Sequence, residues 1–554
     1  MYTVLKRLVV NMSAKQKING IICGDQNFSV PPHLNLGAFV LQKILALDRQ
    51  KTALINGETG EKICYKEMAQ MVVNIATSLT NLGVENGDVV AIFSENRIEC
   101  ILTILAALCS GATVTLLNNA YSKDDLNHAI NISKPTYMFL SGEKFKEHFV
   151  DLKISNLIKK YILYDDPARE NDCLNFKELT GKNVDINLYK PYDFKGSTCT
   201  SFILYSSGTT GPAKGAMISH LNIIVSIQRT PVAKGHVLLL TIAPWSSTMG
   251  LVSTLHEFFN GKTLVFLPKY NENLYLKTIE KYKINLLIVV PPLIVTLYKS
   301  TLAKNFDLSS VKIIYSGGAP VDPRNIHALK SRFPHIELVL QGYGMTEAAG
   351  PITDDLEVTP KEGSVGRVIK GCIVKVVDPD TKKILSYNEP GEVYIKGPVV
   401  FQGYVGRDSK SEFNRDGFYR TGDIAYYDEN GYFYIIDRIK ELIKYKAWQV
   451  SPSELESLIL QHPAVKDVGV TGAPDTLAGE LPTAFLVKQP NANVTEQEII
   501  DFVSDKASHW KRLRGGVIFL KDIPKTPSGK ILRRQLKELL RQHPKQKSKL
   551  SAKL

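Results

Sequence analysis

Residues 201–220 read SFILYSSGTTGPAKGAMISH, an apolar run followed by a loop of unusual composition. Between Ser206 and Gly215 this loop holds three glycines, four hydroxyl side chains and one lysine. Consecutive glycines and hydroxyls expose backbone N–H groups that form an anion-binding nest, and the lysine adds a positive charge. Because open α/β sheets bind ligands at strand ends, we expect a polyphosphate on Ser206, Ser207, Gly208, Thr209, Thr210 and Lys214.

This loop differs from a Walker loop, because glycine follows Lys214 where that motif requires serine or threonine. Similar apolar, β-rich runs recur along the chain and alternate with helical patterns. Near-continuous apolar strands of this kind are typical of parallel sheets buried on both faces. The sequence therefore predicts the α/β class, with strands within 89–93, 113–117, 136–140, 201–205, 237–244, 263–267, 285–292, 311–318 and 337–344.

The pattern changes after about residue 360, where short glycine-punctuated strands predict a β-rich antiparallel subdomain. Within 417–438, Glu429-Asn430-Gly431 is a predicted hairpin turn. Ser451 and Pro452 then mark the start of a helix, as cap and first position. We expect a large N-terminal domain over 1–436, a hinge over 437–440, and a small C-terminal α+β domain with a basic tail over 441–554.

Composition places the chain among globular proteins, with 554 residues, 44% hydrophobic and 22% charged. The formal net charge of +13 is confined to one end, because Lys506–Leu554 holds 15 basic residues and two acidic ones. A basic block can bind nucleic acid, an anionic membrane or a polyanionic small molecule. The part beyond Arg541 also fits a solubilising tail.

Seven cysteines without a C-x-x-C pair indicate free thiols in a reducing compartment and argue against a structural zinc site. The uncharged stretch Cys100–Ser122 is long enough to raise the question of a membrane span. Gly111 divides it into a helix-like half and a strand-like half, each too short to cross a bilayer. We therefore expect a buried helix, a turn and a buried strand.

The phosphate loop resembles the signature of the adenylate-forming superfamily, which includes acyl-CoA synthetases, 4-coumarate–CoA ligases, beetle luciferases and peptide-synthetase adenylation domains. The resemblance covers about residues 50–540, and four further motifs occur in the family's order. They are SGGAP (316–320), QGYGMTEAAG (341–350), YRTGDIAYYDENGYFYIIDRIKELIKYKAWQVSPSELE (419–456) and PKTPSGKILRR (524–534). Together these motifs identify the chain as a member of the superfamily.

The resemblance implies that a carboxylate attacks the α-phosphate of ATP, which yields an acyl-adenylate. Lys530 matches the lysine that bridges the carboxylate and the phosphate, Thr346 meets the α-phosphate, and Glu347 matches the Mg²⁺ ligand. Asp423 and Arg438 resemble the ribose contacts. The adenine site would be formed by Gly317, Gly318, Ala319, Gly342 and Tyr343.

The family also uses a second conformation, in which the mobile small domain rotates about a hinge and withdraws the lysine loop so that CoA forms a thioester. Lys440 matches the hinge position. The basic C-terminal block would then close over ATP and CoA, both polyanions. The CoA-side segment would contribute Lys444, Lys446, Gln449 and Val450.

Two positions depart from the family pattern. Ala447 stands where relatives carry glycine, which costs on the order of 1 kcal/mol if the position needs a positive φ. The segment PWSSTMG (244–250) lacks the histidine that many coumarate ligases and beetle luciferases carry at or near Ser247. Its absence argues against beetle luciferin as substrate. Trp245, Ser247 and Met249 are the predicted acyl-pocket residues, although Trp245 and Met249 would equally fill the core.

These observations predict an acid–CoA ligase that acts on a medium- or long-chain fatty acid or an arylpropenoate with ATP, Mg²⁺ and CoA. A luciferase-type oxygenase with a non-beetle luciferin is the nearest alternative. A third interpretation, a basic protein that binds nucleic acid or membranes, would explain only the basic C-terminal block and not the five ordered motifs. The end Ala552-Lys553-Leu554 resembles the SKL address for the peroxisomal import receptor. The cytoplasm and the mitochondrion are the alternative locations. The mitochondrion is one of them because no acidic residue precedes Asp25, which is typical of a presequence.

Overall fold

A computed structural model describes most of the chain. The described ranges are 20–30, 34–48, 50–154, 157–165, 173–181, 183–194, 199–206, 213–232, 237–356, 359–446, 448–526 and 529–542, without the side chains of 149–154 and 409. Predictions on Ser207, Gly208, Thr209, Thr210, Ala447 and the tripeptide 552–554 therefore fall outside the described residues.

The first large sheet holds the strand that leads into the phosphate loop. Its order is β10-β9-β5-β4-β6-β7-β8, parallel except for the antiparallel pair β9–β10 at one edge. Continuous apolar sequence forms its centre, since such residues are buried on both faces. The bounds are β4 Val89–Phe93, β5 Thr113–Leu117, β6 Tyr137–Leu140, β7 Lys160–Leu163, β8 Cys173–Asn175, β9 Thr200–Ser206 and β10 Lys214–Ser219.

The second large sheet carries the SGGAP and QGYGMTE motifs at its strand ends. Its order is β17-β16-β15-β14-β13-β11-β12-β2-β3, with a parallel centre and antiparallel edges. The bounds are β2 Thr52–Asn56, β3 Lys62–Cys64, β11 Leu238–Thr241, β12 Thr263–Phe266, β13 Leu286–Val289, β14 Ile313–Gly317, β15 Leu338–Met345, β16 Gly350–Asp354 and β17 Arg367–Val368.

Two smaller sheets are formed mainly by the C-terminal half, and β1 from near the N-terminus joins one of them. An antiparallel sheet, β1-β18-β19-β20-β21, forms the β-rich subdomain, and the small domain contains β23-β22-β25-β24 with β26 beside β25. The bounds are β1 Ile21–Cys23, β18 Ile373–Val377, β19 Gly391–Lys396, β20 Tyr419–Tyr427, β21 Phe433–Arg438, β22 Ile443–Tyr445, β23 Trp448–Val450, β24 Val465–Asp475, β25 Gly479–Lys488 and β26 Val517–Phe519.

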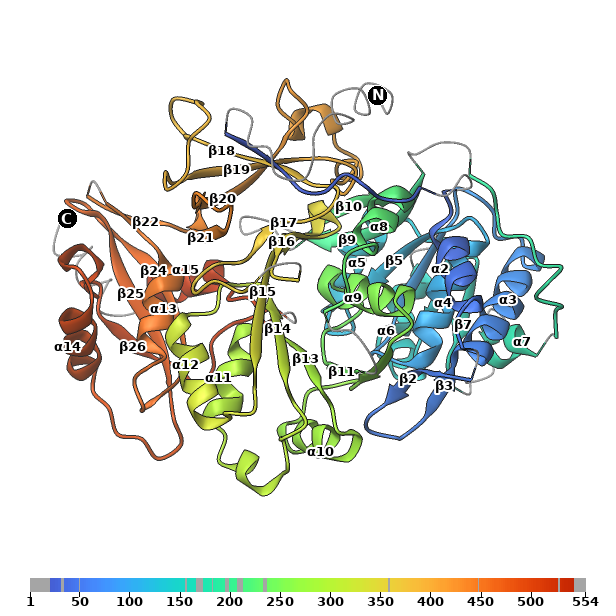
Figure 1. The fold of residues 1–554 in the computed structure, drawn as a ribbon, viewed down its shortest axis with the longest axis horizontal. Coiled ribbons are helices and arrows are strands. Elements are labelled where there is room, and N and C mark those ends of the chain that lie inside the picture. The colour runs from blue at the N-terminus through green and yellow to red at the C-terminus, as the bar shows by residue number, and fades with distance from the viewer. Residues whose placement is uncertain are drawn as a thin grey trace.

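Helices cover these sheets, and the small domain lies on the side of the large domain that carries α11 and α12 (Figure 1). Lys299 at the end of α11 crosses between the domains, since its ammonium donates to the carbonyls of Leu460 and Val465 at 2.8 and 2.9 Å. The bounds are α2 Leu36–Leu45, α3 Tyr65–Asn81, α4 Ile98–Cys109, α5 Lys123–Ser133, α6 Gly142–Ile154, α7 Phe176–Thr180, α8 His220–Ser226, α9 Thr248–Phe259, α10 Glu272–Tyr282, α11 Pro291–Lys299, α12 Pro323–Arg332, α13 Pro452–Ile459, α14 Glu496–Lys506 and α15 Arg533–Gln542.

One contiguous core joins the two large sheets. It includes Ile101 of α4, Phe202 of β9, Phe258 of α9 and Leu264 of β12, all fully buried. The small domain has a separate core around β24, β25 and α13. This division confirms the expected α/β fold with a large N-terminal and a smaller C-terminal domain, while the boundaries at 436 and 440 stay predictions.

The stretch Cys100–Ser122 forms α4, a turn and β5, as the sequence predicts. Gly111 has a φ of +91°, which favours glycine, and it separates the two elements. Within the described ranges, none of the helices has the length and apolar character that crossing a membrane requires.

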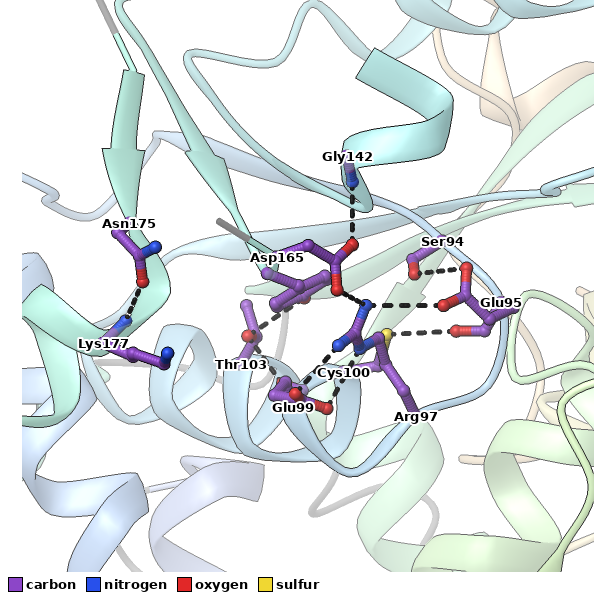
Figure 2. Close-up of polar contacts among 11 residues, drawn as sticks. Ser94, Glu95, Arg97, Glu99, Cys100, Thr103, Gly142, Asp165, Asn175 and Lys177 are labelled. Atoms are coloured by element: carbon purple, nitrogen blue, oxygen red, sulfur yellow. Dashed lines mark hydrogen bonds and ion pairs between the residues drawn. The ribbon is translucent and has the colours of Figure 1, made fainter. Parts of the chain in front are cut away.

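The loop between β4 and α4 is fixed by Arg97, which lies among three carboxylates (Figure 2). Its guanidinium pairs with Glu99 at 3.0 Å, Asp165 at 3.0 Å and Glu95 at 3.4 Å. Asp165 also accepts a 2.9 Å hydrogen bond from the backbone N–H of Gly142 at the start of α6. This network ties three segments of the first sheet together.

Candidate active site

The phosphate-loop strands form a hairpin whose two ends are described. Ser206 at the end of β9 pairs with Lys214 at the start of β10, so these two residues lie side by side. The Lys214 ammonium lies 4.6 Å from the centre of the Tyr404 ring, within range of a cation–π contact. The hairpin therefore holds one lysine charge next to Tyr404.

The predicted adenine-site residues lie together at the ends of two neighbouring strands. Gly317 of β14 pairs with Gly342 of β15 in a parallel register. Gly318 has a φ of +91°, in the region that L side chains avoid. A Cβ on Gly342 would lie 2.2 Å from the Tyr315 hydroxyl oxygen, so only glycine fits there. Ala319 is exposed at the same edge.

Thr346 and Glu347 begin the short 3₁₀ turn Thr346–Ala348 that follows β15. The Thr346 hydroxyl oxygen accepts a 3.0 Å hydrogen bond from Thr248, the first residue of α9. Glu347 is buried, and its Oε1 accepts a 2.6 Å hydrogen bond from the Tyr404 hydroxyl. Burial raises the pKa of Tyr404, and the charge of Glu347 raises it further, so Tyr404 stays a protonated donor.

Asp423, Arg438 and Tyr343 form a second cluster, although they lie far apart in the sequence. The Tyr343 hydroxyl donates to Asp423 Oδ2 at 2.7 Å, and Arg438 Nε donates to Asp423 Oδ1 at 3.1 Å. Burial raises the pKa of Asp423, while Arg438 and the Tyr343 hydrogen bond lower it in part. Each carboxylate oxygen keeps one further lone pair for a ligand hydroxyl.

Lys530 belongs to the small domain, in a loop that lies near the large domain. Gly529, beside it, is close to the large domain, since a Cβ built there would lie 3.7 Å from Val290 Cγ2. Lys530 stays accessible to solvent, yet so much protein surrounds it that burial lowers its pKa, and the charge of Arg438 lowers it further. Asp423, Glu347 and Glu441 oppose this shift, which places Lys530 within electrostatic reach of both clusters.

The predicted acyl-pocket residues occupy different environments. Trp245 is 3% exposed, its ring lies 5.1 Å from that of Phe266, and its indole N–H donates to Thr254, so it belongs to the core. Ser247 caps α9 through a hydrogen bond from the Gly250 N–H. Met249 alone reaches the adenine-site residues, with its sulfur 3.7 Å from a Cβ built on Gly317.

The predicted hinge residue Lys440 and the predicted CoA-side residues lie close together in the sequence, over 440–450. Lys440, Lys444, Lys446 and Gln449 are exposed, whereas Val450 is fully buried in the small-domain core. The first four are thus available to a ligand, and Val450 holds the strand in place.

Tyr404 and Thr248 are contacts of the site that sequence reasoning missed. Tyr404 lies in an unremarkable FQGYVG stretch, and its role depends on a partner 57 residues away. Thr248 lies in the PWSSTMG segment, directly before Met249. This neighbouring position was the only feature of the sequence that could have indicated its place at the site.

Two protein-family models match this chain. The model described as AMP-binding enzyme matches residues 41–405, and the one described as AMP-binding enzyme C-terminal domain matches 454–530. The chain belongs to the AMP-binding enzyme family. This confirms that it is a member of the adenylate-forming superfamily.

Relatives of this AMP-binding enzyme include both CoA ligases and luciferases. A luciferin 4-monooxygenase from Photuris pensylvanica is 37% identical over 90% of this chain and 93% of its own length. The 4-coumarate–CoA ligase-like 9 protein of Arabidopsis thaliana is 35% identical over 93% of both chains. The crystal structure of ATP-bound MatB from Rhodopseudomonas palustris has a TM-score of 0.79 at 28% identity and covers 91% of this chain and 98% of its own.

Glu347 of this AMP-binding enzyme fits a magnesium ligand. Mg²⁺ is usually held by one or two carboxylates together with substrate phosphates and water. Within the described ranges there is no cluster of three or more histidine, cysteine or acidic side chains that could hold a metal alone. Glu347 Oε1 is bound by Tyr404, and no described residue donates to Oε2. A single buried carboxylate with one oxygen unbound in the described part of the chain fits the donor set that Mg²⁺ uses when nucleotide phosphates supply the other ligands.

Proposed function

We propose that this protein is an ATP-dependent acid–CoA ligase. The observation that carries the proposal is that the loop of Lys530 lies against the large domain, where a Cβ built on Gly529 would be 3.7 Å from Val290 Cγ2, and that the charges of Glu347, Asp423 and Arg438 act on the pKa of Lys530. This arrangement brings a cation to the groups predicted to hold the α-phosphate and the ribose. The CoA-ligase relatives support the thioester step.

In the first step a carboxylate oxygen of the acid attacks the α-phosphorus of ATP. A new P–O bond forms, the bond to the β-phosphate oxygen breaks, and pyrophosphate leaves. Lys530 binds the carboxylate and the α-phosphate together, and Thr346 donates to the same phosphate. Negative charge is held on the oxygens around the α-phosphorus and on the leaving pyrophosphate in this step, and fixed donors and cations lower the barrier by stabilising it.

The remaining groups position ATP. Asp423 accepts hydrogen bonds from the two ribose hydroxyls and is itself held by Tyr343 and Arg438. The glycines of β14 and β15 admit the adenine ring against Tyr343. Ser206 and Lys214 hold the outer phosphates. Glu347 holds Mg²⁺, which when bound neutralises charge on the phosphate oxygens.

In the second step the thiol of CoA attacks the acyl carbon of the adenylate. The C–S bond forms, the thiol proton is lost to solvent, the C–O bond to phosphate breaks and AMP leaves. We propose that the small domain turns at Lys440 for this step and presents Lys444, Lys446 and Gln449 to CoA. Two exposed lysines suit a ligand that carries several phosphates.

The acid that we propose is a medium- or long-chain fatty acid or an arylpropenoate. Met249, which is half-buried beside Gly317, supplies an apolar wall for such a chain. The alternative is a luciferase-type oxygenase, in which oxygen replaces CoA in the second step. It is favoured by the 37% identity to the luciferin 4-monooxygenase, and the missing histidine of the 244–250 segment counts against beetle luciferin.

A pyrophosphate-release screen over a carboxylic acid panel, run with and without CoA, tests the proposal. The panel holds saturated acids from C8 to C18, cinnamate and its hydroxylated forms, and beetle luciferin. We expect acid-dependent pyrophosphate release, faster turnover with CoA, and an acyl-CoA product. Oxygen-dependent turnover that CoA does not accelerate would favour the oxygenase instead. Absence of acid-dependent release across the panel would reject both.

A further inference from the structure

The loop that carries Lys530 is held by contacts between Thr526 and Lys530 and by one attachment on each side. The Thr526 N–H donates to the Lys530 carbonyl at 2.7 Å, and the Lys530 N–H donates to the Thr526 hydroxyl at 3.0 Å. Before the turn, Lys525 binds both oxygens of the Asp467 carboxylate at 2.8 and 2.6 Å. After it, α15 begins at Arg533, three residues beyond Lys530.

Arg533 turns inward from the start of α15 toward three acidic groups. Its guanidinium pairs with Glu456 Oε2 at 2.9 Å and with Glu441 Oε2 at 3.4 Å. Asp437 lies near enough that its charge also raises the pKa of Arg533 against the effect of burial. The side chains of Arg533 and Glu456 are each 11% exposed, so this is a nearly buried charge cluster.

The acidic partners are themselves fixed, and they border the predicted hinge. Glu456 lies on α13 and its Oε1 accepts a 2.7 Å hydrogen bond from the Val470 N–H of β24. Asp437, the first residue of the predicted hinge, accepts a 2.6 Å hydrogen bond from Ser451 and a 3.1 Å one from the Ser453 N–H. Glu441 follows the hinge immediately. Arg533 thus connects the Lys530 loop to Glu441 at the end of residues 437–440, with Asp437 at their start near enough to act through its charge.

The next residue provides an internal contrast. Arg534 points outward, with a side chain that is 67% exposed, and pairs with Glu538 one turn along α15 at 3.0 Å. An exposed pair of this kind contributes little to stability, because water screens both charges. The contacts of the nearly buried Arg533 matter more, because removing the arginine would leave two carboxylates with little solvent and without their cation.

We propose that Arg533 is a positioning residue for the adenylate-forming step: by binding Glu441 and Glu456 beside the hinge, it holds the Lys530 loop in the orientation that meets the α-phosphate. This inference rests on the proposed function. Positioning errors of about 1 Å at a reacting group cost up to about 100-fold in rate. Arg533 therefore acts on the first half-reaction, in which Lys530 takes part, and leaves the second unaffected.

The test compares Arg533→Met, Arg533→Lys and the control Arg534→Met. The first half-reaction is followed as single-turnover pyrophosphate release without CoA, using an acid that the panel identifies. The second is followed as thioester formation from synthetic acyl-adenylate and CoA. We expect Arg533→Met to slow the first about 10- to 100-fold and the second less than twofold, with kcat rather than KM for ATP affected. Arg533→Lys should recover part of the loss, and Arg534→Met should match the wild type.

Hydrogen exchange supplies a readout that needs no substrate. Peptides that cover residues 523–542 should exchange faster in Arg533→Met than in the wild type or Arg534→Met. Equal slowing of both half-reactions, or unchanged exchange and rates in Arg533→Met, would overturn the proposal. If Arg533→Met does not fold, Glu441→Gln replaces it with the same expected split between half-reactions. A wild type that releases no pyrophosphate would count against the proposed ligase activity, and the exchange comparison would still decide whether Arg533 holds the loop.

Discussion

Replacing Tyr404 with phenylalanine tests whether the contact with Glu347 organises the phosphate site. The substitution keeps the ring, so the cation–π contact with Lys214 at 4.6 Å remains. It removes the hydroxyl that donates to Glu347 Oε1 at 2.6 Å and lies 3.2 Å from the Tyr419 hydroxyl. Glu347 then keeps its charge in a buried site but loses its one described side-chain donor.

The expected magnitude follows from the chemistry of this contact. A buried hydrogen bond to a charged group contributes about 1.5–3 kcal/mol. If bound Mg²⁺–ATP needs Glu347 in its present orientation, the same free energy is lost from the adenylation transition state, which corresponds to a rate reduction of about 10- to 150-fold. Unfolding stability without nucleotide should fall as well, because the Glu347 carboxylate stays buried without its hydrogen-bond donor.

The assay is acid-dependent pyrophosphate release over a range of Mg²⁺ concentrations, together with thermal unfolding. Tyr426→Phe is the matched control, since Tyr426 lies on β20, its ring stacks on Tyr434 at 4.8 Å, and its hydroxyl has no partner in the described part of the chain. We expect Tyr404→Phe to need more Mg²⁺ and to react more slowly, with the control unchanged. A Tyr404→Phe enzyme with wild-type rate and Mg²⁺ dependence would refute the assigned role of this contact.

Four further substitutions and conditions test the account. Lys530→Ala should nearly abolish adenylate formation while thioester formation from synthetic adenylate persists; equal loss in both assays would contradict the two-conformation scheme. Burial lowers the pKa of Lys530 below its ordinary 10.5, and the reaction needs the protonated, cationic form. Pyrophosphate release should therefore be constant at lower pH and fall as the pH rises through that lowered pKa. Lys530→Arg should lack this alkaline decline. Ala447→Gly should accelerate the CoA step selectively. An unchanged thioester rate would show that alanine at position 447 does not hinder this step. Deleting residues 552–554 should move a tagged protein from peroxisomes to the cytosol, and an unaltered distribution would reject the address.

The sheet cores are the part of the fold that sequence predicts best. Val89–Phe93 and Thr113–Leu117 match the predicted strands at both ends, because strands buried on both faces leave an uninterrupted apolar run. The hairpin strands β20 and β21 and the Ser451 cap of α13 are also confirmed, because turns and helix caps leave signals in a few neighbouring residues.

Two local features were less visible in the sequence. The run 285–292 ends as a strand at Val289, and its prolines begin α11, since proline is well suited to the first turn of a helix. Residues Lys214–Ser219 form the edge strand β10, which lacks the long apolar run of the central strands.

Contacts between distant segments account for the rest of the site. Glu347 with Tyr404, and Arg533 with Glu441 and Glu456, depend on how strands and domains pack, which no local pattern encodes. Trp245 shows the converse, because its apolar character fits a pocket wall as well as the core, and only the packing against Phe266 and the hydrogen bond to Thr254 place it in the core.

The central claim is that a carboxylate oxygen of the acid becomes bonded to the α-phosphorus of ATP before CoA captures the acyl group. The most direct measurement uses an acid labelled with ¹⁸O in both carboxylate oxygens, with ATP and CoA, and mass spectrometry of the products. The account predicts AMP that carries one ¹⁸O atom, unlabelled pyrophosphate, and acyl-CoA that keeps the other ¹⁸O. AMP without label, or ADP in place of AMP, would contradict it.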